Sequence, residues 1–69
     1  MIILYSSTNC AGCETLKSRL KERQIAFEVI SIDKNVVAKE KVLAAGYRSV
    51  PQLFDTVQDT FITQESLGL

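Results

Sequence analysis

The residues best suited to chemistry are Cys10 and Cys13, the only two cysteines in the chain. They follow an apolar run at residues 2–5 and open a charged segment, residues 14–24, that favours a helix. In the first turn of a helix, residues three apart have Cα atoms roughly 5 Å from one another. A disulfide allows about 4.4–6.8 Å. The pair can therefore close and open with little backbone movement, and its spacing predicts reversible disulfide chemistry.

A helix start also favours the reactive form of a thiol. The attacking species is the thiolate, and a helix N-terminus offers it unpaired N–H groups and about half a positive charge. Cys10 comes first, so we expect it at the exposed mouth of the helix as the nucleophile. Cys13, on the face shared with Leu16 and Leu20, is expected to be more buried and to act as the resolving thiol. Gly12 leaves room for an approaching disulfide partner.

Two other interpretations of the cysteines compete with this one. A structural staple is poorly placed, because a disulfide that closes so short a loop contributes only about 2 kcal/mol on the chain-entropy model. A structural zinc site needs four ligands, usually Cys and His, and this chain has two Cys and no His. A cluster shared between two chains would need thiolates from both chains or from a small thiol cofactor.

Composition limits the possible classes. With 69 residues, residues 1–69 are expected to form one small domain. Eight basic and eight acidic residues give no net charge, which argues against a general nucleic-acid binder. No apolar run approaches the roughly 18 residues of a membrane span, and the N-terminus lacks signal-peptide features. We expect a cytoplasmic monomer, in a compartment where a close cysteine pair is more often catalytic or metal-binding than structural.

The elements that position the cysteines can be predicted from the first half of the chain. Residues 2–6 form an apolar run without alternation, which indicates a central strand covered on both faces. Thr8 or Asn9 is expected to cap the helix at residues 11–24. Residues 25–32 are expected to form a second strand, with the odd-numbered side chains on one face and the even-numbered side chains on the other.

A second helix is expected over residues 36–45, capped by Asp33 or Asn35. Gly46 is expected to follow it in the left-handed conformation. Its inner face should carry Val36, Leu43 and one of Val37 or Ala44. Its outer face should carry Lys39, Glu40 and Lys41.

The last third of the chain contains the only proline, Pro51. A proline cannot donate to a sheet ladder, so it should begin the strand of residues 52–54, and Val50–Pro51 is a candidate cis bond. Residues 55–59 are turn-like, and residues 60–62 are expected to pair with residues 52–54 as a hairpin. Residues 63–69 are expected to form a short helix capped by Thr63. The order β-α-β-α-β-β predicts an α/β fold: a four-stranded mixed sheet flanked by helices, with parallel strands across the first crossover.

Several of these motifs together carry a family resemblance. They are S-x-x-N-C-x-x-C after the first strand, D-K-N before the second helix, and A-G-Y-R-S-V-P-Q-L-F. With them, nearly the whole chain resembles the glutaredoxin branch of the thioredoxin superfamily. The stretch G-Y-R-S-V-P and the lack of a Gly-Gly pair also resemble the NrdH-type redoxins. The resemblance implies a thioredoxin-like, glutaredoxin-type fold, a cis Val50–Pro51 bond, Pro51 packed against the cysteines, and Val50 backbone pairing with an extended thiol substrate.

The chain departs from the common glutaredoxin pattern where glutathione binds. The usual Pro-Tyr between the cysteines is Ala11-Gly12, a frequent basic residue is Ser7, and the Gly-Gly pair is Thr63-Gln64. Ser66 can take the place of the residue that meets the γ-glutamyl end. Arg48 either replaces the missing cation or is an exposed loop residue. The expected substrate or glutathione contacts are Ser7, Thr8, Arg48, Ser49, Val50, Pro51, Gln64 and Ser66.

The function implied by the resemblance is a thiol–disulfide oxidoreductase that reduces protein or glutathione mixed disulfides. Its expected reductant is glutathione, with no metal, and its protein substrates would include ribonucleotide reductase. One alternative is an NrdH-type redoxin that is reduced by thioredoxin reductase. A second is a module that holds an iron–sulfur cluster between Cys10 and two glutathiones across a dimer. A third is a structural or interaction domain with an idle disulfide.

Overall fold

A computed structural model describes all residues, 1–69. The elements in chain order are β1 (Ile2–Ser6), α1 (Ala11–Glu22), β2 (Phe27–Ser31), α2 (Val36–Ala44), β3 (Gln52–Asp55), β4 (Thr60–Ile62) and a 3-10 turn, η1 (Glu65–Leu67). The strands form one mixed sheet in the order β2-β1-β3-β4. Strands β1 and β2 are parallel, and the β1–β3 and β3–β4 pairs are antiparallel. The predicted α/β architecture is confirmed.

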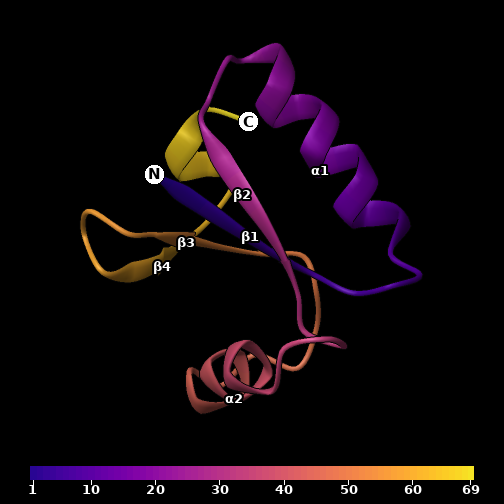
Figure 1. Cartoon of the computed structure of the whole chain (residues 1–69). Helices are drawn as coiled ribbons and strands as arrows, with labels where there is room; N and C mark the ends of the chain where they lie inside the picture. The colour runs from indigo at the N-terminus through magenta and orange to yellow at the C-terminus, as the bar shows by residue number, and fades with distance from the viewer.

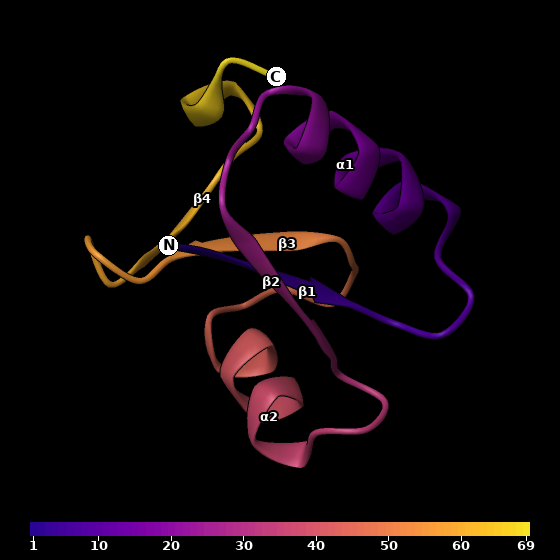
Figure 2. The ribbon, with the colours of Figure 1, turned by 45° about the horizontal axis from the view of Figure 1, so that its top comes forward.

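The two helices lie on opposite faces of the sheet. Figures 1 and 2 show α1 and the C-terminal turn on one face and α2 on the other. Each face has its own buried cluster. The cluster on the α1 face is Ile2, Leu4, Leu16, Leu20 and Leu53. The cluster on the α2 face is Tyr5, Ala38, Val42 and Phe54. Strand β1 contributes to both clusters, which explains why its apolar residues do not alternate with polar ones.

Helix α1 begins where it was predicted but with a different cap. Cys10 is the N-cap residue, and its Sγ accepts a hydrogen bond from the Cys13 N–H at 3.0 Å. The prediction that Thr8 or Asn9 caps this helix is wrong, since Thr8 donates to Asp33 instead. The helix ends at Glu22, two residues earlier than predicted. Gln24 follows it in the left-handed region, with φ of 56°.

Helix α2 begins at Val36, as predicted, and ends at Ala44, one residue earlier than predicted, and it has a different buried face. Asn35 Oδ1 accepts from the Ala38 N–H at 3.0 Å, and Gly46 has φ of 91°. The predicted inner stripe is wrong: Val36, Val37 and Leu43 are 71%, 75% and 48% exposed. The buried residues are Ala38 and Val42.

The segment after α2 leads into β3 through the only proline of the chain. The Val50–Pro51 bond is cis, as predicted, and Pro51 immediately precedes β3. Strands β3 and β4 form the predicted hairpin. The C-terminal helix is only the 3-10 turn η1, and Thr63 Oγ1 accepts from the Ser66 N–H at its start, at 3.3 Å. None of the helices combines the length and the apolar character that crossing a bilayer requires.

Candidate functional site

Cys10 and Cys13 form a disulfide across the first turn of α1. Their Cα atoms are 5.2 Å apart, in agreement with the helical spacing on which the prediction depended. Cys10 is partly exposed, whereas Cys13 is 2% exposed. The cysteine nearer the start of the helix is therefore the one that an outside molecule can reach.

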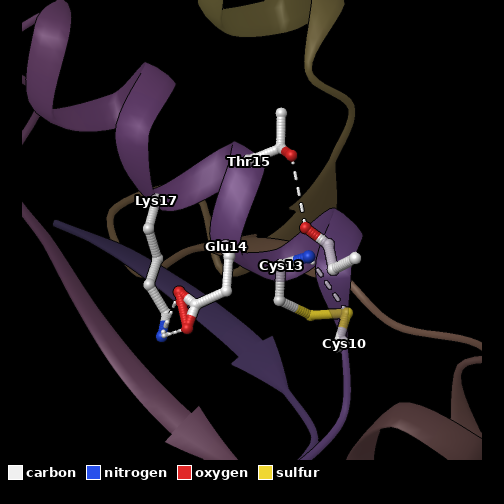
Figure 3. A network of polar contacts seen from close by, with 6 residues as sticks. Cys10, Cys13, Glu14, Thr15 and Lys17 are labelled. Carbon is white, nitrogen blue, oxygen red and sulfur yellow. Dashed lines mark hydrogen bonds and ion pairs between the residues drawn. A yellow bond between two sulfur atoms is a disulfide. The ribbon is translucent and has the colours of Figure 1, made fainter.

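The first turn of α1 presents a hydrogen-bond donor to Cys10. Figure 3 shows the Cys13 N–H directed at Cys10 Sγ, beside the disulfide. Glu14, the one acidic residue of this turn, forms an ion pair with Lys17 at 3.1 Å. Its carboxylate is turned toward Lys17 and away from the sulfurs (Figure 3). When the disulfide is reduced, this N–H and the positive end of the helix can stabilise a thiolate on Cys10.

Pro51 lies beside the residues that separate the cysteines. A Cβ atom built on Gly12 would be 3.5 Å from Pro51 Cδ, which is ordinary van der Waals contact. The fold therefore brings the cis-proline loop against the start of α1. Packing of Pro51 against the cysteines themselves, which the resemblance implied, stays a prediction. The same distance shows that the fold itself has room for a side chain at position 12.

Two cavities flank this junction. One has a volume of about 290 Å³ and lies between the loops after β1, β2 and α2; its lining residues are Ser7, Ile32, Asp33, Lys39, Val42, Leu43, Tyr47, Arg48, Ser49 and Val50. We call it the α2-side cavity. The other, of about 200 Å³, is called the β4-side cavity and is lined by Leu16, Tyr47, Pro51, Gln52, Leu53, Ile62, Thr63 and Gln64. Tyr47 lines both cavities.

The structure divides the predicted contact residues between these cavities. Four of them line the α2-side cavity: Ser7, Arg48, Ser49 and Val50. Pro51 and Gln64 line the β4-side cavity. Thr8 lines neither cavity, but it bonds to Asp33, which lines the first. Ser66 also lines neither, and its Oγ is 3.2 Å from Thr63 Oγ1.

The two cavities differ in charge. The α2-side cavity carries Asp33, Lys39 and Arg48, whereas the lining of the β4-side cavity contains no charged residue. Beside the β4-side cavity, Arg19 donates to Gln64 Oε1 at 3.4 Å. Arg48 is exposed and lines the α2-side cavity at the same time.

Sequence reasoning missed the role of Asp33 in this region. Asp33 Oδ2 accepts from both the N–H and the hydroxyl of Thr8, each at 2.8 Å. These bonds, the backbone one first, hold the pKa of Asp33 below its ordinary value of 3.8, with a smaller contribution from Lys39. The motif D-K-N marked this position, but nothing in the sequence paired it with a residue 25 positions away.

Tyr47 was also missed. Its ring lies 5.1 Å from that of Phe61, which in turn contacts the rings of Tyr5 and Phe54. The loop that carries Arg48 to Pro51 is thereby anchored to the sheet by an aromatic contact. No group of three or more His, Cys, Asp or Glu side chains is gathered in the structure.

The fold and the site together define a class. A mixed four-stranded sheet, a disulfide across the first turn of α1 and a cis-proline beside it are the features of a thioredoxin-like dithiol protein. The crystal structure of the thioredoxin-like protein BC3987 is similar, with a TM-score of 0.82 and 22% identity over 99% of this chain and 96% of that one. Wheat glutaredoxin has a TM-score of 0.64 and 23% identity over 77% of this chain and 53% of that one.

Sequence comparison identifies the family. The Glutaredoxin family model matches residues 2–62, and the chain belongs to the glutaredoxin family. It is 41% identical over 51 residues to "Glutaredoxin-like protein NrdH" of Lactococcus lactis subsp. lactis (strain IL1403), covering 74% of this chain and 71% of the relative. It is 32% identical over 50 residues to the protein of the same name in Escherichia coli (strain K12), covering 72% of this chain and 62% of the relative.

Proposed function

We propose that this protein is a thiol–disulfide oxidoreductase in which Cys10 is the nucleophile and Cys13 is the resolving thiol. The observation that supports this most directly is the asymmetry of the pair. Cys10 is partly exposed at the N-cap of α1 and accepts the Cys13 N–H. Cys13 is buried on the inner face of the helix. A substrate can therefore reach the Cys10 sulfur, whereas the Cys13 sulfur can react only with Cys10.

The proposed cycle transfers two electrons. The Cys10 thiolate attacks one sulfur of a substrate disulfide, so that a mixed disulfide forms and the other substrate sulfur leaves as a thiolate. The Cys13 thiolate then attacks Cys10 Sγ. The second substrate thiolate leaves, and the Cys10–Cys13 disulfide remains. The substrate is reduced by two electrons, and the protein is oxidised by two.

Substrate binding is proposed at the α2-side cavity and the loop beside it. Val50 lines that cavity directly before the cis-proline, and Ser7, Arg48 and Ser49 line it as well. We expect an extended polypeptide with its disulfide at Cys10 to pair with the Val50 backbone. Ribonucleotide reductase is the protein substrate that the family resemblance implies.

We propose a flavoprotein reductase of the thioredoxin reductase type as the electron source, in preference to glutathione. Glutathione carries two carboxylates, but the lining of the β4-side cavity contains no charged residue. Thr63 and Gln64 stand there in place of a Gly-Gly pair, and Gln64 accepts a hydrogen bond from Arg19. The similarity to two proteins named NrdH supports the same choice.

The roles of the cysteines are tested by two matched variants. Cys10→Ser should lose disulfide reductase activity, because no exposed thiolate remains. Cys13→Ser should accumulate a long-lived mixed disulfide on Cys10, visible by mass spectrometry of the intact protein under non-reducing conditions. Full activity in Cys10→Ser, or no trapped intermediate in Cys13→Ser, would refute the assignment.

The electron source is tested by a coupled assay that follows NADPH oxidation with a protein disulfide as substrate. We expect turnover with thioredoxin reductase and little with glutathione plus glutathione reductase. Faster turnover with the glutathione system would establish the alternative reductant while leaving the roles of the cysteines unchanged.

A further inference from the structure

The segment that leads into Cys10 has a single attachment by hydrogen bonds. Residues 7–9 connect β1 to α1 without regular structure. Their only hydrogen bonds are the two that Thr8 donates to Asp33 Oδ2, both at 2.8 Å. We call these two bonds the Thr8–Asp33 clamp. It lies two residues before the cysteine that we propose as nucleophile.

Asp33 is itself held in place. On one side, the Ile32 N–H donates to Ser6 O at 2.8 Å and extends the pairing of β1 with β2. On the other side, Asn35 caps α2. The Asp33 N–H also donates to Ser31 Oγ at 3.3 Å. The clamp therefore attaches a segment with no other hydrogen bonds to a well-anchored one.

The position of Cys10 Sγ depends on the segment that the clamp holds. Cys10 has the extended backbone of an N-cap residue, with φ of −123° and ψ of 98°. With this backbone its sulfur accepts the Cys13 N–H, as the side chain of an N-cap residue does. In the reduced protein no disulfide holds the sulfur there, so the hydrogen bonds around Cys10 must do so.

We propose that Asp33 is a positioning residue for the Cys10 thiolate and acts through Thr8. This inference rests on the proposed function. Asp33 fixes residues 7–9, and these keep Cys10 Sγ at the start of α1 after the disulfide is reduced. Loss of the clamp lets the sulfur leave the Cys13 N–H, and the thiolate then loses its stabilisation.

The charge of Asp33 acts on the Cys10 thiolate in the direction opposite to its hydrogen bonds. An experiment can therefore distinguish positioning by Asp33 from a direct electrostatic effect of its carboxylate. A carboxylate near a thiol disfavours the thiolate, so removal of the charge alone would favour ionisation of Cys10. Lys39, which lines the same cavity as Asp33, offsets part of its charge. Loss of the hydrogen bonds and loss of the charge thus change the reactivity of Cys10 in opposite directions.

The experiment measures the rate and the pH dependence of iodoacetamide modification at Cys10 in the reduced, full-length protein. Asp33→Ala removes both the hydrogen bonds and the charge, whereas Asp33→Asn keeps a carbonyl acceptor without the charge. Thr8→Val removes the hydroxyl bond only, and Thr8→Ser retains it. Glu40→Ala on α2 is a control, since the Glu40 side chain is exposed and makes no hydrogen bond or ion pair.

At neutral pH Asp33→Ala should be modified about three- to tenfold more slowly than Asp33→Asn, the equivalent of one or two hydrogen bonds, and its profile should lie at higher pH. Thr8→Val should show a smaller change in the same direction. Asp33→Asn and Thr8→Ser should modify at about the wild-type rate or faster.

Asp33→Ala and Asp33→Asn both lack the charge, and only Asp33→Asn keeps an acceptor for Thr8. The proposal is overturned if these two variants are modified at the same rate. Thr8→Val keeps the backbone bond and provides the same test if Asp33→Ala does not fold. Because the readout uses no substrate or reductase, the clamp can fail while the wild-type protein still reduces disulfides. Conversely, the Asp33 variants can behave as expected even if Cys13→Ser accumulates no mixed disulfide on Cys10.

Discussion

At the scale of single residues, the chemistry depends on what surrounds each sulfur. Cys10 Sγ receives a backbone N–H at the N-cap of α1, and Cys13 lies 2% exposed one turn further. Glu14 is the acidic side chain nearest in sequence, and its ion pair with Lys17 draws it away from the sulfurs. Cys10 Sγ is therefore accessible and accepts a backbone donor, whereas Cys13 is shielded from solvent.

Replacement of Gly12 shows whether the open space between the cysteines is needed for stability or for substrate binding. Gly12→Ala adds a Cβ in ordinary contact with Pro51, so the free energy of unfolding should stay unchanged or rise by up to about 1 kcal/mol from better helix propensity. We expect the KM for a protein disulfide to rise, because the added methyl would narrow the space that we propose for the substrate at the cysteines. Urea unfolding and steady-state kinetics measure the two effects. A large loss of stability would contradict the packing described for Pro51.

Asp33 gives the molecule a defined acid dependence. Its hydrogen bonds to Thr8 lower its pKa below the ordinary 3.8. The ionised carboxylate therefore stabilises the fold above that ordinary value, and this contribution is lost as the pH falls through the lowered pKa. The stability difference between wild type and Asp33→Asn should be constant above pH about 5 and shrink at lower pH. Denaturant unfolding at a series of pH values checks this, and a difference that grows on acidification would contradict it.

The cysteine site also shows which features could be predicted from the sequence and which could not. The Cα distance of the cysteine pair and its order of exposure followed from helical spacing alone. The cap did not, because Thr8 and Asn9 are of the usual capping types, whereas the N-cap of α1 is Cys10 itself. The partner of Thr8 is 25 residues away, and no local pattern encodes so distant a contact.

At the scale of elements, α2 shows how tertiary packing decides which face is buried. Ala38 and Val42 are one helical turn apart and face Tyr5 and Phe54. Lys41 places its Nζ 3.6 Å from the centre of the Phe54 ring, so a charged residue covers aromatic surface. Hydrophobicity alone favoured Val36, Val37 and Leu43, and for that reason the predicted stripe was wrong.

The two valines Val42 and Val37 test this orientation on one helix. Val42→Ala removes buried methyl groups, at roughly 0.8 kcal/mol per methylene plus a cavity term, and should destabilise the fold by about 2 kcal/mol. Val37→Ala should change stability by at most about 0.5 kcal/mol, because Val37 is 75% exposed. Urea unfolding of both variants compares them directly. Equal losses would show that α2 is turned differently on the sheet.

At the scale of the whole molecule, the sheet brings together loops from distant parts of the sequence. The loop after β1 carries Cys10, the loop before β3 carries Pro51, and α1 and α2 pack on opposite faces (Figure 2). The order of elements and the mixed sheet were predictable, since the apolar runs and turn residues are local signals. The cavities were not, because each is lined by residues from several separate segments.

The cores on both faces, not the disulfide, should hold this arrangement together. The disulfide closes a very short loop, so its reduction should lower the free energy of unfolding by only about 2 kcal/mol. The reduced protein should remain folded with the same far-ultraviolet circular dichroism. Urea titrations with and without dithiothreitol measure the difference. A reduced chain that is unfolded in the absence of urea would show that the disulfide is a structural staple.

The central claim is that the two sulfurs differ because of where the fold places them. The most direct test treats the reduced wild-type protein with limiting iodoacetamide at neutral pH and locates the label by peptide mass spectrometry. We predict that the label is found on Cys10, which reacts faster than a cysteine in an unstructured peptide, while Cys13 stays unmodified. Preferential labelling of Cys13, or labelling of both at the rate of the unstructured peptide, would contradict the account.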